Sequence, residues 1–219
     1  MALTRHEDLS LKYVLNVPSD RPDTEAMPLV VLMHGRGADA FDLADVAPMI
    51  DGGYRFVFPN APKPFEAAPG MTFGWTWFDG WPPVGNSFFE SRELLLTFLD
   101  EITQRYPTTK TVLSGFSQGA LMSFDVGFRT DVPLAGVIAM SGAIFEGDMP
   151  DFAARKDLPV LIVHGSVDDM IPVLAARRAR RILEEHSIEP EYHEFPMGHH
   201  VTEESMAVVR DFLERVMAA

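Results

Sequence analysis

Short apolar runs bounded by glycine, proline or polar residues alternate along the chain with longer segments in which apolar residues recur at helical spacing. Leu95, Leu99 and Ile102 show that spacing before Pro107, and residues 206–216 show it near the end of the chain. The short runs predict seven strands, near residues 10–17, 29–34, 54–58, 111–116, 135–141, 159–164 and 191–195. Such alternation is typical of a mostly parallel sheet with helices on both faces, and we expect the first run to form an edge strand.

The composition fits one domain. With 219 residues and 47% hydrophobic content, the chain is long enough to bury the core of a single α/β domain, which we expect to span residues 1–219. Its formal net charge of −14 argues against a nucleic-acid partner or an anionic membrane surface, because phosphate binding depends on positive charge. The chain has no cysteine, which excludes disulfides, thiolate metal sites and a cysteine nucleophile.

The sequence contains no visible targeting or membrane-spanning segment. The first 17 residues lack a basic start followed by an apolar core of the required length. The longest uncharged runs, 111–124 and 132–145, are shorter than the roughly 20 residues that a bilayer needs. We therefore expect a cytoplasmic protein with no membrane insertion, and the sequence leaves open whether it is a monomer or a homodimer.

Ser117 lies between Gly115 and Gly119, directly after a predicted strand and before the apolar residues 120–122. Glycines at these two positions suit a sharp strand-to-helix turn, because side chains there would clash. Such a turn pushes the serine out of the sheet and places the N–H of Gln118, at the start of the helix, where an oxyanion would form. The pentapeptide predicts a nucleophile for acyl transfer, although it also occurs around ordinary turn serines.

The loops after two later strands carry the other groups that a nucleophilic serine needs. Asp168 and Asp169 follow the run 159–164, and His199 and His200 follow the run 191–195. One histidine would take the serine proton as general base, while one carboxylate would fix its tautomer and stabilise the imidazolium. The order serine, acid, histidine is the one that serine hydrolases with a strand-to-helix nucleophile turn follow.

An earlier loop supplies a candidate for the remaining part of such a site. His34, Gly35, Arg36 and Gly37 follow the apolar residues 29–33. The glycines let the backbone approach a substrate closely, and the N–H of Arg36 would join that of Gln118 as an oxyanion donor. Because four independent segments fall in the expected order at the ends of predicted strands, a catalytic site is favoured over a chance match.

Seven segments carry a resemblance to a known family: LMHGRGADAFDL at 32–43, FPNAP at 58–62, WFD at 77–79, GFSQGA at 115–120, SG at 141–142, HGSVDDMIP at 164–172 and PMGHHVTEE at 196–204. Over nearly its whole length the chain resembles the phospholipase/carboxylesterase family of serine hydrolases, which includes the acyl-protein thioesterases. The resemblance implies an α/β-hydrolase fold without a separate lid domain. It selects Ser117 as nucleophile, Asp168 as orienting acid and His199 as base. The chain departs from many family members at Arg36 and His200.

The same resemblance implies the function. We expect a serine carboxylesterase that cleaves small-molecule esters, or thioesters, through an acyl-enzyme and without a cofactor. A lysophospholipase or an acyl-protein thioesterase would use the same mechanism. A non-catalytic binding protein on this fold would normally have lost one of the three catalytic residues, and this chain keeps Ser117, Asp168 and His199.

Five aromatic residues cluster in a segment rich in glycine and proline: Phe73, Trp75, Trp77, Phe78 and Trp81. The segment is too irregular for a core helix. Loops at strand ends commonly line binding sites, so we expect these rings to form the wall of the substrate pocket. Because no long insertion occurs elsewhere, the wall should be small and partly open, which predicts a preference for short to medium acyl chains.

The remaining histidines have simpler explanations than chemistry. We expect His34 and His164, each before a glycine at a strand end, to serve as structural hydrogen-bonding groups. A zinc site formed by His193, His199 and His200 is disfavoured because their spacing matches no common ligand pattern. We therefore expect no metal site.

Overall fold

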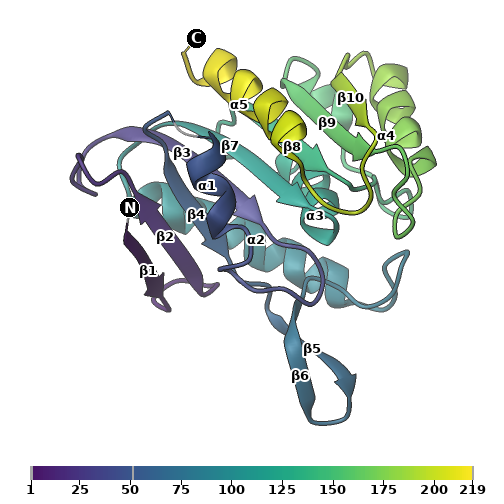
Figure 1. Ribbon diagram of the computed structural model, residues 1–219, viewed down its shortest axis with the longest axis horizontal. Coiled ribbons are helices and arrows are strands. Elements are labelled where there is room, and N and C mark those ends of the chain that lie inside the picture. The colour runs from purple at the N-terminus through teal and green to yellow at the C-terminus, as the bar shows by residue number, and fades with distance from the viewer. Residues whose placement is uncertain (1, 51, 219) are drawn as a thin grey trace.

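The computed structural model describes residues 2–50 and 52–218 and has an eight-stranded sheet at its centre (Figure 1). The strands lie in the order β1 (Ala2–His6), β2 (Tyr13–Val17), β4 (Arg55–Pro59), β3 (Met27–Met33), β7 (Thr108–Phe116), β8 (Gly136–Met140), β9 (Val160–Gly165) and β10 (Glu191–Phe195). β1 and β2 pair antiparallel, as do β2 and β4, whereas the other six strands of this sheet, β4, β3, β7, β8, β9 and β10, run parallel to one another. The carboxyl ends of the parallel strands therefore meet at one end of the sheet.

Helices cover both faces of this sheet (Figure 1). They are α1 (Ala47–Ile50), α2 (Ser87–Arg105), α3 (Gln118–Gly127), α4 (Leu174–Glu185) and α5 (Glu203–Ala218), together with two 3₁₀ helices, Ala44–Val46 and Phe152–Arg155. Successive side chains of a strand point to opposite faces. In β3, Val30 and Leu32 therefore pack with α1 and α5, whereas Leu29, Val31 and Met33 pack with α2 and α3. Within the described residues, no helix has the length and apolar character that a bilayer crossing needs.

A separate two-stranded hairpin, β5 (Lys63–Ala68) and β6 (Met71–Thr76), projects from the body of the molecule (Figure 1). An isolated bridge joins β6 to the loop after β3. In this bridge the N–H of Trp75 donates to the carbonyl of Ala38 at 2.8 Å. The hairpin is thereby attached to the loop in which the sequence predicts an oxyanion donor.

All seven predicted strands are present, but the prediction of the edge was wrong. The run 10–17 forms β2, which begins only at Tyr13 and lies second in the sheet. The edge strand is β1, whose Leu3, Thr4 and Arg5 are exposed and therefore give no apolar signal. The hairpin was missed although apolar residues alternate with polar residues and glycine along β6, because the prolines and glycines in and around the hairpin indicated an irregular segment.

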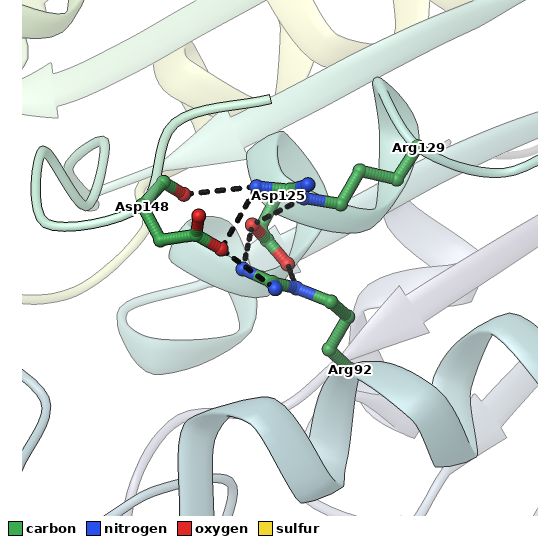
Figure 2. A network of polar contacts seen from close by, with 4 residues as sticks. All are labelled: Arg92, Asp125, Arg129 and Asp148. Carbon is green, nitrogen blue, oxygen red and sulfur yellow. Dashed lines mark hydrogen bonds and ion pairs between the residues drawn. The ribbon is translucent and has the colours of Figure 1, made fainter. Parts of the chain in front are cut away.

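Four charged residues link α2, α3 and the loop after β8 (Figure 2). Arg92 donates to Asp125 at 2.6 and 2.8 Å, and another of its nitrogens lies 2.7 Å from Asp148. Arg129 donates to both carboxylates at 3.1 Å. The side chains of Arg92 and Asp125 are only 9% and 5% exposed, whereas that of Asp148 is 41% exposed. Removing the charge of Asp125 would therefore leave a buried guanidinium without its main partner.

We expect Asp125→Asn to lower the free energy of unfolding by about 3 kcal/mol, because one guanidinium nitrogen would face an amide N–H in a buried site. A loss of that size lowers the melting temperature of a domain this large by roughly 6–12 °C. Asp148→Asn is the matched control and should cost less than about 1 kcal/mol, because water screens an exposed pair. Urea unfolding of both variants measures the difference, and equal losses would contradict the role of burial.

Candidate active site

Ser117 occupies the one-residue turn between the end of β7 and the start of α3. Its backbone has φ +57° and ψ −118°, a strained conformation for a residue other than glycine. A Cβ at Gly115 would lie 2.2 Å from the carbonyl oxygen of Gly119, and a Cβ at Gly119 would lie 2.2 Å from that of Met33. Both positions therefore require glycine: Gly119 because the turn is pressed against the neighbouring strand β3, and Gly115 because the start of α3 lies against the end of β7.

Ser117, His199 and Asp168 form a continuous hydrogen-bonded chain, although they come from loops after three different strands. Nε2 of His199 lies 2.9 Å from Oγ of Ser117, and Nδ1 lies 2.8 Å from Oδ2 of Asp168. The imidazole also packs on Phe116, with the ring centroids 4.8 Å apart. A proton acceptor thus lies beside the hydroxyl and a carboxylate on the far side of the ring, as general-base activation of a serine requires.

Asp168 is held by its own loop. Its side chain is fully buried, and Oδ1 accepts the N–H groups of Met170 at 3.0 Å and Ile171 at 2.8 Å. Burial raises the pKa of this carboxyl, but the hydrogen bonds from Ile171 and His199 outweigh burial and hold the pKa of Asp168 below its ordinary value. The neighbouring Asp169 is exposed. The carboxylate that faces His199 is therefore Asp168, in its ionised form.

The loop after β3 packs against the same serine. An atom at the Cβ position of Gly35 would lie 3.3 Å from Cβ of Ser117, and Arg36 and Gln118 both line the cleft onto which Ser117 opens. Across residues 2–50 and 52–218, neither the N–H of Arg36 nor that of Gln118 has a hydrogen-bond partner. The positive end of the α3 dipole lies at the same point. Both N–H groups are thus available to a ligand in the cleft.

Comparison with known proteins agrees with this geometry. The family described as Phospholipase/Carboxylesterase matches residues 20–217. The chain belongs to this family. It is 29% identical over 181 residues to acyl-protein thioesterase 1 of Candida albicans, which covers 72% of this chain and 76% of that protein. It is also 29% identical over 178 residues to acyl-protein thioesterase 1 of Neurospora crassa, which covers 73% of this chain and 72% of that protein.

Solved structures show the same fold. Esterase PE8 matches with a TM-score of 0.75 and 29% identity over 92% of this chain and 99% of its own. A carboxylesterase from Mesorhizobium loti matches with a TM-score of 0.82 and 20% identity over 96% of this chain and 98% of its own. The predicted α/β-hydrolase fold and the assignment to ester-hydrolysing enzymes of the serine hydrolase superfamily are confirmed.

In this phospholipase/carboxylesterase family member, the side chain of Gln118 has a role that the sequence reasoning did not assign. Its Oε1 accepts from Oγ1 of Thr76 at 2.9 Å and from the N–H of Trp77 at 3.1 Å, and its Nε2 donates to the carbonyl of Phe78 at 2.8 Å. The amide is buried, so these three bonds satisfy it without water. Gln118 therefore fastens the segment after β6 to the turn that carries Ser117.

Ser117 opens onto a cleft of about 640 Å³, formed by six parts of the chain. These are the loop after β3, the hairpin, the segment after the hairpin, the turn at Ser117 and the two loops that carry Asp168 and His199. The apolar side chains that line it are Phe65, Trp81, Phe116, Met170 and Ile171. A volume of this size is in the usual range for a small-molecule site.

Of the five aromatic residues expected in the pocket wall, only Trp81 lines the cleft, and the other four lie elsewhere. Trp77 and Phe78 are completely buried in the core. Trp75 borders a different hollow, and Phe73 is 60% exposed on the hairpin. Glycine and proline marked the segment as irregular, but they do not show which rings a turn buries. The hydrogen bonds from the Gln118 side chain, which draw Trp77 and Phe78 inward, have no signature in the sequence.

Four apolar residues that line the cleft were not predicted as pocket residues: Phe65, Phe116, Met170 and Ile171. Phe65 belongs to β5 of the hairpin, which was not predicted, so nothing placed its ring near Ser117. Met170 is two residues after Asp168, in a loop whose position after a strand was recognised. The closeness of Met170 to Asp168 in the sequence was the available signal that it lies near the cleft.

The two buried histidines make structural hydrogen bonds, as expected from the sequence. Nδ1 of His34 lies 2.7 Å from the carbonyl of Gly35, and Nε2 accepts the N–H of Ala61 at 3.0 Å. Because a carbonyl can only accept, these bonds assign the proton of His34 to Nδ1. Nε2 of His164 donates to the carbonyl of Ile171 at 2.8 Å and so supports the loop that holds the orienting acid.

The three histidines weighed as zinc ligands do not gather at one place. His199 contacts Ser117, while Nε2 of His193 lies 2.9 Å from Oε1 of Glu191. In the part of the chain that the structure describes, no group of three or more histidine, aspartate or glutamate side chains is arranged to hold a metal ion.

Burial of His34 makes stability depend on pH. Burial lowers the pKa of His34 from 6.5 to about 4, so the folded protein keeps the ring neutral at pH values where the unfolded chain binds a proton. Stability should therefore be full near pH 7 and fall as pH drops through 6.5 towards 4, with a loss of about 2 kcal/mol by pH 5 from this group. Urea unfolding at both pH values measures the loss, and His34→Asn should show a shallower pH dependence. An NMR signal assigned to the His34 imidazole that titrates near pH 6.5 would contradict the lowered pKa of His34.

Proposed function

We propose that the protein is a serine carboxylesterase that hydrolyses short- to medium-chain acyl esters, and thioesters by the same route, through an acyl-enzyme on Ser117. The observation that carries the proposal is the hydrogen-bonded chain from Oγ of Ser117 through His199 to Oδ2 of Asp168. Membership of the Phospholipase/Carboxylesterase family supports the reaction class.

In the first half of the reaction, Oγ of Ser117 attacks the carbonyl carbon of the ester while Nε2 of His199 takes its proton. The negative charge that develops on the carbonyl oxygen is stabilised by the N–H groups of Arg36 and Gln118 and by the amino end of α3. Asp168 keeps the Nδ1 proton of the imidazole in place and stabilises the imidazolium.

The tetrahedral intermediate then collapses. His199 gives the proton to the oxygen or sulfur of the leaving group, and the acyl group stays on Ser117 as an ester. Water, deprotonated by the same imidazole, attacks the acyl-enzyme through a second oxyanion, releases the carboxylic acid and restores the hydroxyl. His199 carries both protons: from Oγ of Ser117 to the leaving group in the first half, and from water to Oγ of Ser117 in the second.

The cleft supports the preference for shorter acyl chains. Trp81 and Met170 line it but are 42% and 69% exposed, so much of the apolar wall is in contact with water. Each methylene that reaches the wall gains up to about 0.8 kcal/mol, and one that projects beyond it gains almost nothing. A second candidate, an acyl-protein thioesterase acting on lipidated proteins, is favoured by the names of two relatives. A lysophospholipase would use the same residues.

We expect Ser117→Ala to lower the turnover of p-nitrophenyl butyrate by roughly a millionfold, because no other group replaces the nucleophile. Asp168→Asn should lower it by about 10⁴-fold. The N–H groups of Met170 and Ile171 will hold the amide oxygen at the Oδ1 position, so that the NH₂ faces His199 and forces the wrong tautomer.

Asp169→Asn is the matched control, since Asp169 is exposed and adjacent in sequence, and it should retain nearly all of the turnover. Steady-state kinetics on the three purified variants measures these effects. A larger loss at Asp169 than at Asp168, or substantial activity in Ser117→Ala, would refute the assignment.

Trp81→Ala should shift the preferred acyl length, because it removes the aromatic ring that lines the cleft beside Ser117. Trp75→Ala removes a ring of the same size outside the cleft and should leave the preference unchanged. The ratio of kcat/KM along a series from acetyl to palmitoyl p-nitrophenyl esters measures the shift. If kcat/KM instead rises steadily to the palmitoyl ester in the wild type and in both variants, the cleft wall is not shallow. The acyl-protein thioesterase would then be the favoured candidate.

A further inference from the structure

Among the described residues that line the cleft, Arg36 carries the only permanent positive charge and Asp42 the only carboxylate. Among the described residues, no carboxylate oxygen lies within 4.0 Å of the Arg36 guanidinium. Arg92, Arg177 and Arg178, by contrast, each pair with a carboxylate at 2.6 to 2.8 Å. The backbone of Arg36 has a place in the proposed reaction, but its side chain has none.

The guanidinium is nevertheless held in position. It lies over the ring of Phe65, 4.7 Å from the ring centroid, which leaves the N–H groups at its edge free to bind. Phe65 pairs with Gly74 in the hairpin, and a Cβ at Gly74 would lie 2.1 Å from the oxygen of Gly37. Gly37 in turn donates its N–H to the carbonyl of Trp75 at 2.8 Å. The ring beneath the guanidinium and the loop that carries Arg36 are therefore fixed to each other.

Neither Asp79 nor Asp42 forms an ion pair with this charge. Asp79 pairs with Lys63, and that hydrogen bond is the main reason why the pKa of Asp79 lies below its ordinary value; the charge of Arg36 lowers it too, but by less than Lys63 does. Burial and the charge of Asp39 raise the pKa of Asp42. The Arg36 guanidinium thus offers several unused N–H donors in the cleft onto which Ser117 opens.

We propose that the side chain of Arg36 binds a carboxylate of the substrate, so that the enzyme prefers esters that carry a second, free carboxylate over neutral esters of the same shape. The proposal rests on the proposed esterase function and adds a substrate class to it. A guanidinium matches a carboxylate with two parallel hydrogen bonds, and each such charge-assisted bond is stronger than a neutral one. The net charge of −14 repels anions in general, so a preference for them needs a local cation.

The experiment compares two isosteric pairs of esters. Monoethyl adipate and its primary amide place the charge in the acyl part, whereas the butyryl esters of 4-hydroxybenzoate and 4-hydroxybenzamide place it in the alcohol part. The quantity measured is the ratio of kcat/KM for the anionic ester to that for the neutral one. In Arg36→Gln we expect this ratio to fall roughly 10- to 100-fold for one pair, mainly through KM, since hydrogen bonds to charged groups contribute about 1.5–3 kcal/mol.

Any disturbance of the oxyanion loop affects both members of a pair and cancels in the ratio. Arg36→Lys should recover part of the preference, because it restores the charge without the planar fork. Arg181→Gln is the matched control: it makes the same change in net charge at an exposed site outside the cleft, and its ratio should stay at the wild-type value.

The outcomes separate the two claims. A ratio within about twofold of wild type in Arg36→Gln for both pairs, or an equal fall in Arg181→Gln, overturns the role of Arg36 while the esterase function stands. If the wild-type protein turns over none of the four esters, the esterase function fails, and the proposal for Arg36 fails with it.

Discussion

The contact between the turn at Ser117 and the end of β3 constrains the whole catalytic end of the sheet. At Gly119 the helix backbone lies so close to the carbonyl of Met33 that no Cβ fits, and Ser117 is forced to positive φ. The same device recurs at Gly165, where a Cβ would lie 2.2 Å from the carbonyl of Met197, in the loop that carries His199. Close backbone contacts at glycines therefore set the distances among the reacting groups.

Hydrogen bonds then determine which charges these loops can hold. Asp168 is buried yet ionised because two N–H groups and His199 stabilise its charge, whereas burial of His34 outweighs its hydrogen bond to Gly35 and the charge of Asp39, so that His34 stays neutral. The side chain of Gln118 ties the segment after the hairpin to the same turn. Among the described residues, the cleft is thus lined by the Ser117 hydroxyl, by Arg36 and Gln118, whose N–H groups are unpaired, and by one guanidinium, that of Arg36.

The sequence was sufficient for the parts of the site that depend on backbone geometry. Glycine spacing around Ser117 and the order of loops after strands predicted which residues meet, because parallel strands bring their carboxyl ends together. It was insufficient where a side chain is placed by long-range contacts. Trp77 is buried through bonds to Gln118, which is 41 residues away, and Phe65 reaches the cleft on a hairpin whose prolines and glycines indicated an irregular segment. The edge strand β1 was missed because its central residues are exposed and mostly polar.

The most direct test is a crystal structure of the protein after reaction with a fluorophosphonate, which forms a stable tetrahedral adduct on an activated serine. The account predicts phosphorus bonded to Oγ of Ser117, with one phosphonate oxygen within hydrogen-bonding distance of the N–H groups of both Arg36 and Gln118, and with His199 still bonded to Asp168. An adduct on another serine, or a phosphonate oxygen that contacts neither N–H group, would contradict it.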